Sequence, residues 1–375
     1  MYARELHYWN SVSIGGKDYL ASKPLPSEEL KIMGLKITYA PWGETLAELV
    51  DAAQRAEKAG AEVVWVPELH RSATIAAAAM AAGTSSIGIG TAIALAFTRS
   101  PLITALEALD LDEMSNGRFI LGLGSGVERL NQDWHNARWG KPVAHIRETV
   151  AIVRQIMAQS HLGERMTFEG EFERIDIRGF TRPFTPARTN IPIYLGGMGP
   201  VMTKLAGEIG DGWISHELCS PKYLGEMLGP WLTEGREKSG RDRKELDVVV
   251  SAACAIDKDA KQAKRWAAGL IGFYATVKTY ADFFEFHGML DQQNAVIEKF
   301  RTGVSSDDLG DVVPDEMVDA LTLAGDTDEV IEKIARYEGL ADTVKLSPPT
   351  HGLDNATVRQ AQNQIIEMIP SLVRG

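Results

Sequence analysis

The chain has 375 residues, which is enough for one large barrel with insertions or for two smaller domains. Apolar residues make up 45% and charged residues 24%, as in an ordinary globular protein. The formal net charge of −12 argues against nucleic acid or an anionic membrane as a partner, because either would need a basic face. With only two cysteines, Cys219 and Cys254, no disulfide framework is expected, and a reducing cytoplasm is the simplest location.

The first residues, 1–10, mix charges and lack an apolar core, so they do not form a signal peptide. We interpret residues 1–30 as an N-terminal arm that packs on the bottom of the domain or on a partner subunit. Residues 31–375 are expected to form one domain. Segment 72–98 carries no charge, but its small residues favour a helix and then a buried strand over a membrane span.

From residue 35 onward, short apolar runs alternate with amphipathic helical runs. Eight strands are expected, at 35–40, 62–67, 87–95, 119–123, 191–195, 212–215, 246–256 and 342–346. Helices are expected at 45–59, 75–82, 101–114, 145–159, 200–209, 221–239, 314–323, 327–338 and 355–369, with a long helical region at 260–301. The stretch 163–189 lacks this rhythm and is interpreted as an insertion with short strands at 166–168 and 172–177.

Eight strands alternating with helices predict an α/β fold, a (β/α)8 TIM barrel with insertions. A doubly wound sheet would give a similar alternation. However, the turn after the first strand, Ala40-Pro-Trp-Gly-Glu44, is not the glycine-rich turn of a dinucleotide-binding sheet.

In such barrels the site lies at the carboxyl ends of the strands. After the fifth strand, Gly196-Gly-Met-Gly-Pro200 precedes a helix, so free backbone N–H groups and the helix dipole favour an anion there. Lys204 is expected to add positive charge. The alternative is a tight turn without a ligand, and we favour a phosphate site.

Glu68 and His70 follow the second strand, where either side chain is placed for acid, base or hydrogen-bonding work. The alternative is a polar strand end satisfied by its neighbours. Metal chemistry is poorly supported, because His216-Glu-Leu-Cys219 lacks a second histidine at the zincin spacing. Gly124-Ser-Gly126 also lacks the Gly-x-Ser-x-Gly elbow of a serine hydrolase.

Four motifs together resemble the luciferase-like monooxygenase superfamily, and in particular its branch that uses the deazaflavin coenzyme F420. They are Val64-Trp-Val-Pro-Glu68, Gly90-Thr-Ala-Ile93, Ser115-Asn-Gly-Arg-Phe119 with Leu121-Gly-Leu-Gly-Ser-Gly126, and Ile193-Tyr-Leu-Gly-Gly-Met-Gly-Pro200. Each motif is weak alone, and their order and spacing are fairly specific.

The resemblance implies a bulge in the third strand with a non-proline cis peptide at Ala92–Ile93, on which the cofactor ring rests. It implies that the loop after the fifth strand binds the cofactor phosphate and that Glu68 lies near the ring. The implied cofactor-binding residues are Thr91, Ala92, Ile93, Ser125, Gly126, Gly196, Gly197, Met198 and Gly199. It also suggests a homodimer.

Two departures argue against glucose-6-phosphate as the substrate. Sugar-phosphate dehydrogenases of this family carry a histidine at the position of Leu69 and a glutamate at the position of Val127. His70 and Glu128 are the neighbouring candidates to replace them.

The leading hypothesis is hydride transfer between coenzyme F420 and a small organic substrate, with His70 handling a proton and Glu68 orienting the ring. The alternatives are an FMNH2-dependent monooxygenase on the same barrel, a cofactor-binding protein without catalysis and, more distantly, a metal-dependent hydrolase. The substrate is expected to be shaped by residues 129–142 and 269–303.

Overall fold

The computed structural model describes residues 11–14, 17–20 and 34–373, and the chain divides into two compact units, Met1–Lys31 and Ile32–Gly375. In the first unit, β1 (Ser11–Ile14) pairs antiparallel with β2 (Lys17–Leu20). Most of the expected N-terminal arm lies outside the described residues, so its packing stays a prediction.

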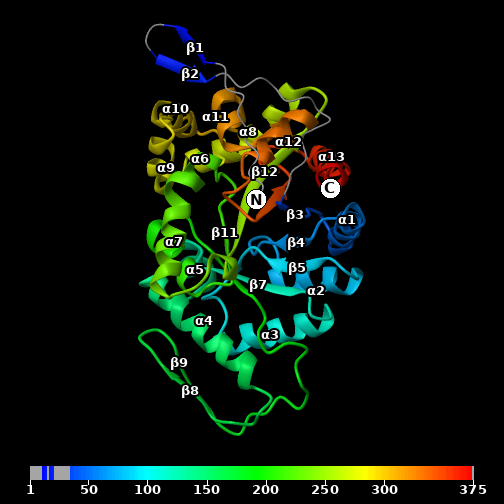
Figure 1. The fold of residues 1–375 in the computed structure, drawn as a ribbon, viewed down its shortest axis with the longest axis vertical. Helices are drawn as coiled ribbons and strands as arrows, with labels where there is room; N and C mark the ends of the chain where they lie inside the picture. Colours follow the sequence, from blue (N-terminus) through cyan, green and yellow to red (C-terminus); the bar gives the residue numbers. More distant parts are fainter. Residues whose placement is uncertain (1–10, 15–16, 21–33, 374–375) are drawn as a thin grey trace, which may run out of the picture. The chain divides into compact units, whose positions relative to one another are not determined.

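The second unit contains a closed barrel of eight parallel strands, which confirms the predicted TIM barrel (Figure 1). The strands are β3 (Lys36–Tyr39), β4 (Val63–Val66), β5 (Gly88–Thr91), β7 (Phe119–Gly124), β10 (Ile193–Gly196), β11 (Gly212–Ile214), β12 (Asp247–Ile256) and β14 (Thr343–Ser347). The barrel closes because β10 pairs with both β7 and β11, while β14 pairs with both β12 and β3.

Helices follow the strands around the barrel. They are α1 (Leu46–Ala59), α2 (Ala73–Gly83), α3 (Pro101–Met114), α4 (Pro142–Gln159), α5 (Pro200–Ile209), α6 (Pro221–Tyr223), α7 (Gly229–Lys238), α8 (Ala260–Ala275), α9 (Ala281–Phe286), α10 (Leu290–Arg301), α11 (Asp315–Leu321), α12 (Thr327–Ala335) and α13 (Asn355–Val373). The first three begin at hydroxyl residues, Thr45, Ser72 and Ser100, whose side chains accept a first-turn backbone N–H. The sequence therefore marks these helix starts locally.

Three predicted elements differ from the structure. The strand expected at 87–95 breaks after Thr91 and resumes as the two-residue β6 (Ala94–Leu95), which pairs with β7. The helical region 260–301 is three helices, with Gly288 in a left-handed conformation (φ 70°) before α10. The helix expected at 314–323 ends at Leu321, and β13 (Leu323–Gly325) then pairs with β12.

A separate apolar cluster fills the barrel interior, formed by Trp65, Tyr194, Ile214 and Val249 from four different strands. The Trp65 and Tyr194 rings lie 5.8 Å apart between centroids. Below them, the Tyr194 hydroxyl donates to Asp247 Oδ2 at 2.8 Å. The interior is therefore a packed core, which leaves the strand ends to form a site.

The stretch 163–189 forms an antiparallel hairpin of β8 (Met166–Glu169) and β9 (Arg174–Ile177), drawn beyond α4 in Figure 1. The carboxylate of Glu148 in α4 anchors its turn by accepting the backbone N–H groups of Glu171, Phe172 and Glu173 at 2.8 Å each. The uncharged segment 72–98 contains α2, β5 and β6. Across the described ranges, no helix has both the length and the apolar character that crossing a membrane requires.

Candidate active site

The third strand carries a bulge at its carboxyl end, and the Ala92–Ile93 peptide bond within it is cis, as the resemblance implied. The bulge is tied to the neighbouring strand, because Ala92 N donates to Val66 O at 2.8 Å and Glu68 N donates to Ile93 O at 3.1 Å. Ala92 and Ile93 are half-buried, whereas Thr91 and Ala94 on either side are buried. The bulge therefore presents a small apolar surface at the end of the barrel where a site is expected.

Two glycines of the sequence motifs make room for Ile93. A Cβ atom at Gly124 or at Gly196 would lie 2.9 Å from the Ile93 side chain. Gly196 was expected to contact the cofactor phosphate. The contacts of both glycines show a packing role first: they let the Ile93 side chain sit between β7 and β10.

Two of the implied cofactor residues form hydrogen bonds within the strand ends. The Thr91 hydroxyl is buried, where it donates to Gly122 O at 2.7 Å and accepts from Gly122 N at 2.8 Å. Ser125 Oγ donates to the carbonyl of Gly126 at 3.0 Å, and Gly126 has a positive φ of 63°. Thr91 therefore joins β5 to β7, while Ser125 and Gly126 shape the turn that follows β7.

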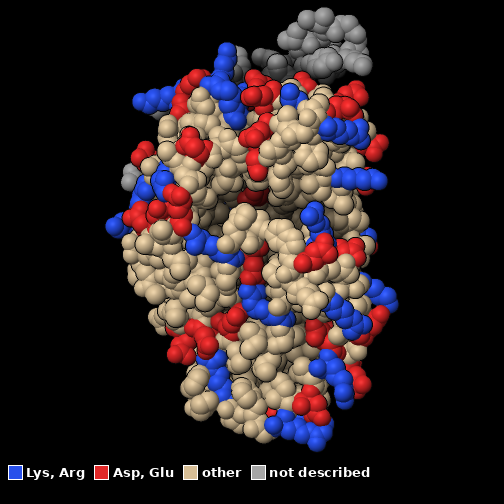
Figure 2. Space-filling model, turned by 180° about the vertical axis from the view of Figure 1, so that it is seen from behind, with Lys and Arg blue, Asp and Glu red and all other residues tan. Residues whose placement is uncertain are grey.

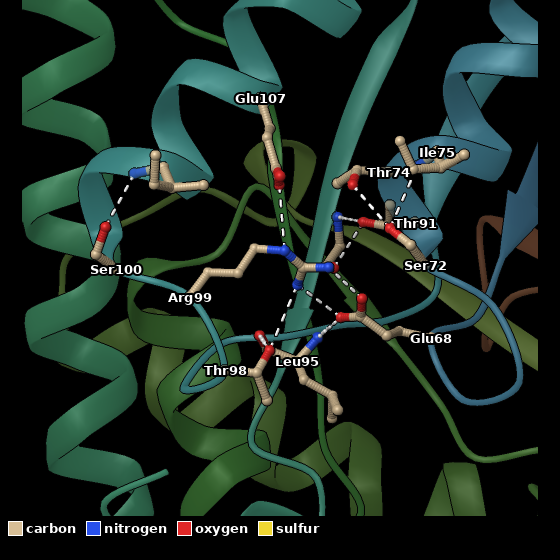
Figure 3. Close-up of polar contacts among 12 residues, drawn as sticks. Glu68, Ser72, Thr74, Ile75, Thr91, Leu95, Thr98, Arg99, Ser100 and Glu107 are labelled. Atoms are coloured by element: carbon tan, nitrogen blue, oxygen red, sulfur yellow. Dashed lines mark hydrogen bonds and ion pairs between the residues drawn. The ribbon is translucent and has the colours of Figure 1, made fainter. Parts of the chain in front are cut away.

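Glu68 is held in an ion pair with Arg99 (Figure 3). Arg99 donates through both terminal nitrogens to the two carboxylate oxygens, and Leu95 N donates to Oε2 at 2.8 Å. Arg99 Nε also lies 3.3 Å from the Glu107 carboxylate. Burial tends to raise the pKa of Glu68, but the hydrogen bonds from Arg99 and Leu95 outweigh it and lower the pKa. Glu68 is thus an ionised group that fixes the segment following the bulge.

His70 lies apart from this network. Its side chain is exposed and forms no hydrogen bond with another described residue, and it lies near enough to His351 to contribute to the lowered pKa of that histidine. The structure therefore places Glu68 beside the bulge and His70 on the open side of the same strand end. The two side chains do not share a hydrogen-bond network within residues 34–373.

The loop Gly196–Gly199 leads into α5, which has no side-chain cap. Trp213 Nε1 donates to the carbonyl of Gly197 at 2.9 Å and fixes the loop. A Cβ atom at Gly199 would meet no described atom within 4 Å, so the space beside the helix start is open. The uncapped N–H groups and this space suit an anionic group. The charge expected from Lys204 is used elsewhere, because its ammonium pairs with Glu234 at 2.7 Å.

A second polar group lies at the end of the predicted sixth strand, where a site is expected, but the sequence assigned it no catalytic role and disfavoured His216 as a metal ligand. His216 and Glu217 follow β11, and Lys345 lies in β14. Lys345 Nζ is 3.7 Å from Glu217 Oε1. Their position at the ends of predicted strands was the available signal. The sequence did not show that the three side chains lie close together, because their strands are far apart in the chain.

Burial governs the protonation of this group. It lowers the pKa of His216 to about 4, so the imidazole is neutral near pH 7. Burial lowers the pKa of Lys345, while the Glu217 carboxylate acts to raise it. Burial tends to raise the pKa of Glu217, but the charge of Lys345, the first of several opposing effects, lowers it, and the net result is a lowered pKa.

Charges of both signs are mixed over the face in Figure 2, which is hollowed near its centre. In the parts of the chain that the structure describes, no set of three or more His, Cys, Asp or Glu side chains is arranged to hold a metal ion.

The chain belongs to the luciferase-like monooxygenase family, whose sequence profile matches residues 30–343. A Mycobacterium tuberculosis protein, provisionally named a coenzyme F420-dependent oxidoreductase, is 33% identical, over 83% of this chain and 93% of that protein. The 5,10-methylenetetrahydromethanopterin reductase of Methanolobus tindarius is 32% identical, over 80% of this chain and 90% of that protein. The solved coenzyme F420-dependent tetrahydromethanopterin reductase of Methanopyrus kandleri shares the fold, with a TM-score of 0.77 at 24% identity over 90% and 98% of the two chains.

Proposed function

We propose that this protein is an oxidoreductase that transfers a hydride between coenzyme F420 and a small organic substrate. Support comes from the names of the relatives and from the bulge and the uncapped loop, which lie at the ends of strands on one side of the barrel. When bound, the deazaflavin supplies the hydride chemistry, and the protein supplies binding and orientation.

The observation that carries the proposal is the position of two open surfaces. The half-buried surface of Ala92 and Ile93 follows β5, and the uncapped start of α5 follows β10. Both strands pair with β7. A planar ring fits the apolar surface, and a phosphate fits the N–H groups of Gly196–Gly199 and α5. Thr91, Ser125 and Gly126 lie at the strand ends between them.

Glu68 then acts as a positioning residue. Its carboxylate accepts the N–H of Leu95 and holds Arg99, so it fixes the chain that leaves the bulge. His70 remains the candidate to exchange a proton with the substrate, because its imidazole is exposed and without a hydrogen bond to the described chain. FMN stays the alternative cofactor, with an FMNH2-dependent monooxygenase as the alternative function.

Parallel fluorescence titrations with coenzyme F420 and with FMN test the proposal. We expect tight binding of F420 and weak binding of FMN, after which hydride donors and acceptors are screened as substrates. Preference for FMN would move the protein to the monooxygenase alternative, and oxygen uptake would be measured next. Binding of neither cofactor would overturn the proposal. The homodimer and the cytoplasmic location remain predictions, the first checked by sedimentation.

A further inference from the structure

The second polar group lies on the side of the barrel away from the bulge. The circular strand order is β5, β7, β10, β11, β12, β14, β3 and β4, so β12, which lies between β11 and β14, stands opposite β5. We define the β11–β14 cluster as His216, Glu217, Lys345 and Ser347. Tyr274 and Tyr280 pack on the His216 ring, with centroid distances of 4.3 and 5.0 Å.

The charges of Glu217 and Lys345 cancel, and of the two only the Glu217 carboxylate is accessible to solvent. The Lys345 side chain is 6% exposed, whereas the Glu217 side chain is 31% exposed at a separation of 3.7 Å. The enclosed ammonium is thus compensated by a carboxylate that still faces open space. An incoming anion would meet that carboxylate first, with no uncompensated cation beside it in the cluster.

The cluster also offers unused hydrogen-bonding groups. His216 Nδ1 accepts from Leu218 N at 3.2 Å, so in the neutral ring the proton lies on Nε2. Nε2 forms no hydrogen bond to any described residue. The Ser347 hydroxyl is buried beside the Glu217 carboxylate, where it helps to lower the pKa of Glu217. A carboxylate acceptor and a neutral donor therefore lie together beside aromatic rings.

We propose that the β11–β14 cluster binds the polar end of the substrate, an uncharged group that carries an N–H donor beside a carbonyl acceptor, and that it rejects anions. Glu217 accepts the N–H, and His216 Nε2 donates to the carbonyl. Tyr274 and Tyr280 form the wall beside it. This inference rests on the proposed function, because it assigns the bulge side of the barrel to the cofactor and this side to the substrate.

Benzamide and benzoate serve as matched probes, since they share shape and differ in charge and in the N–H donor. Their dissociation constants are measured by ligand-observed NMR on the purified protein without cofactor. We expect benzamide to bind about tenfold more tightly than benzoate, the effect of one charge-assisted hydrogen bond. Equal binding, or tighter binding of benzoate, would overturn the proposal.

Substitutions assign the preference to the cluster. Glu217→Gln leaves Lys345 without its counter-ion, so the preference should reverse in favour of benzoate. Because an unpaired buried ammonium threatens folding, the double variant Glu217→Gln/Lys345→Met is measured as well, and it should bind neither probe preferentially. His216→Asn keeps an acceptor for Leu218 N and removes the Nε2 donor, so it should weaken benzamide binding about fivefold.

The matched control is Glu234→Gln, the same substitution at an exposed residue paired with Lys204 on the outer helices. It should leave the preference unchanged. A preference that survives in the double variant would overturn the assignment. Titration of F420 into the same variants separates the two proposals: failure of wild-type protein to bind F420 defeats the proposed function, whereas loss of probe selectivity alone defeats only this inference.

Discussion

A Cβ atom on Gly90 would lie 2.3 Å from the indole ring of Trp65, so the two residues share the barrel interior only because one of them lacks a side chain. Gly90 belongs to the motif Gly90-Thr-Ala-Ile93, whose other three residues the resemblance assigns to the cofactor. Its neighbour shows that it accommodates the largest side chain of the inner cluster.

Gly90→Ala should therefore destabilise the fold by about 1–3 kcal/mol, because the indole would have to leave its packed position. Urea unfolding followed by tryptophan fluorescence measures the free energy of unfolding. The control is Gly199→Ala, whose added methyl group meets no described atom within 4 Å. Equal stability of wild type and Gly90→Ala would show that the interior is not tightly packed.

Gly199→Ala should instead weaken cofactor binding, because its methyl group occupies the open space proposed for the phosphate. We expect about a fivefold higher dissociation constant for F420, equivalent to about 1 kcal/mol. Fluorescence titration gives this value. An unchanged dissociation constant would show that the cofactor phosphate does not bind at this loop.

Glu68→Gln should cost about 1.5–3 kcal/mol of stability, because Arg99 loses its bidentate partner. It should also weaken F420 binding by loosening the chain that follows the bulge. Glu107→Gln is the control, since it leaves the Glu68–Arg99 pair in place. Comparable losses of stability and of F420 affinity in both variants would argue against a special role for Glu68.

His70→Ala should lower turnover about a hundredfold while leaving the F420 dissociation constant within about twofold, as expected for loss of a proton-transfer group. Leu69→Ala is the control, because the adjacent side chain is also exposed. Steady-state kinetics with the substrate found by screening measures the effect. Full turnover in His70→Ala would show that a group other than His70 transfers the proton.

Lowering the pH should remove the contribution that Glu57 makes to the stability of the fold. Its Oε1 accepts the backbone N–H groups of Ser85, Ser86 and Ile87. Burial tends to raise the pKa of Glu57, but these hydrogen bonds outweigh it and lower the pKa to about 2. A lowered folded-state pKa stabilises the fold above the unfolded value of about 4.3, and this stabilisation is lost as the pH falls toward 2.

Glu57→Gln should therefore cost about 1–2 kcal/mol at pH 7 and clearly less at pH 3, as measured by urea unfolding at both values. Glu62→Gln, at an exposed position near the same end of the barrel, supplies the control. A loss that does not depend on pH would exclude the carboxylate charge as its cause.

The strands of the barrel were predictable because each is a short apolar run bounded by turn residues. All eight appear within a few residues of the expected positions. The break after Thr91 was not visible in periodicity, since residues 87–95 are uncharged and almost entirely apolar, and only the family resemblance indicated the cis bond at Ala92–Ile93. The split of 260–301 was missed because its apolar residues continue across the turns.

The site was less predictable, because its partners are distant in sequence. A strand end pointed to Glu68 but not to Arg99, and the helix after the glycine loop pointed to Lys204 but not to Glu234. The positive charge of Lys204 suggested a free cation at the phosphate loop, but Lys204 pairs with Glu234 on the outer helices. Likewise, nothing in the spacing of His216 and Glu217 showed that Lys345 faces them.

The inner cluster of Trp65, Tyr194, Ile214 and Val249 has a kinetic consequence. Because packed side chains close the barrel interior, a molecule that reaches the bulge must enter and leave on the side where the strands end. Two reactants that enter from the same side hinder each other's access to the site. Binding should then be ordered, with the molecule seated deepest entering first and leaving last.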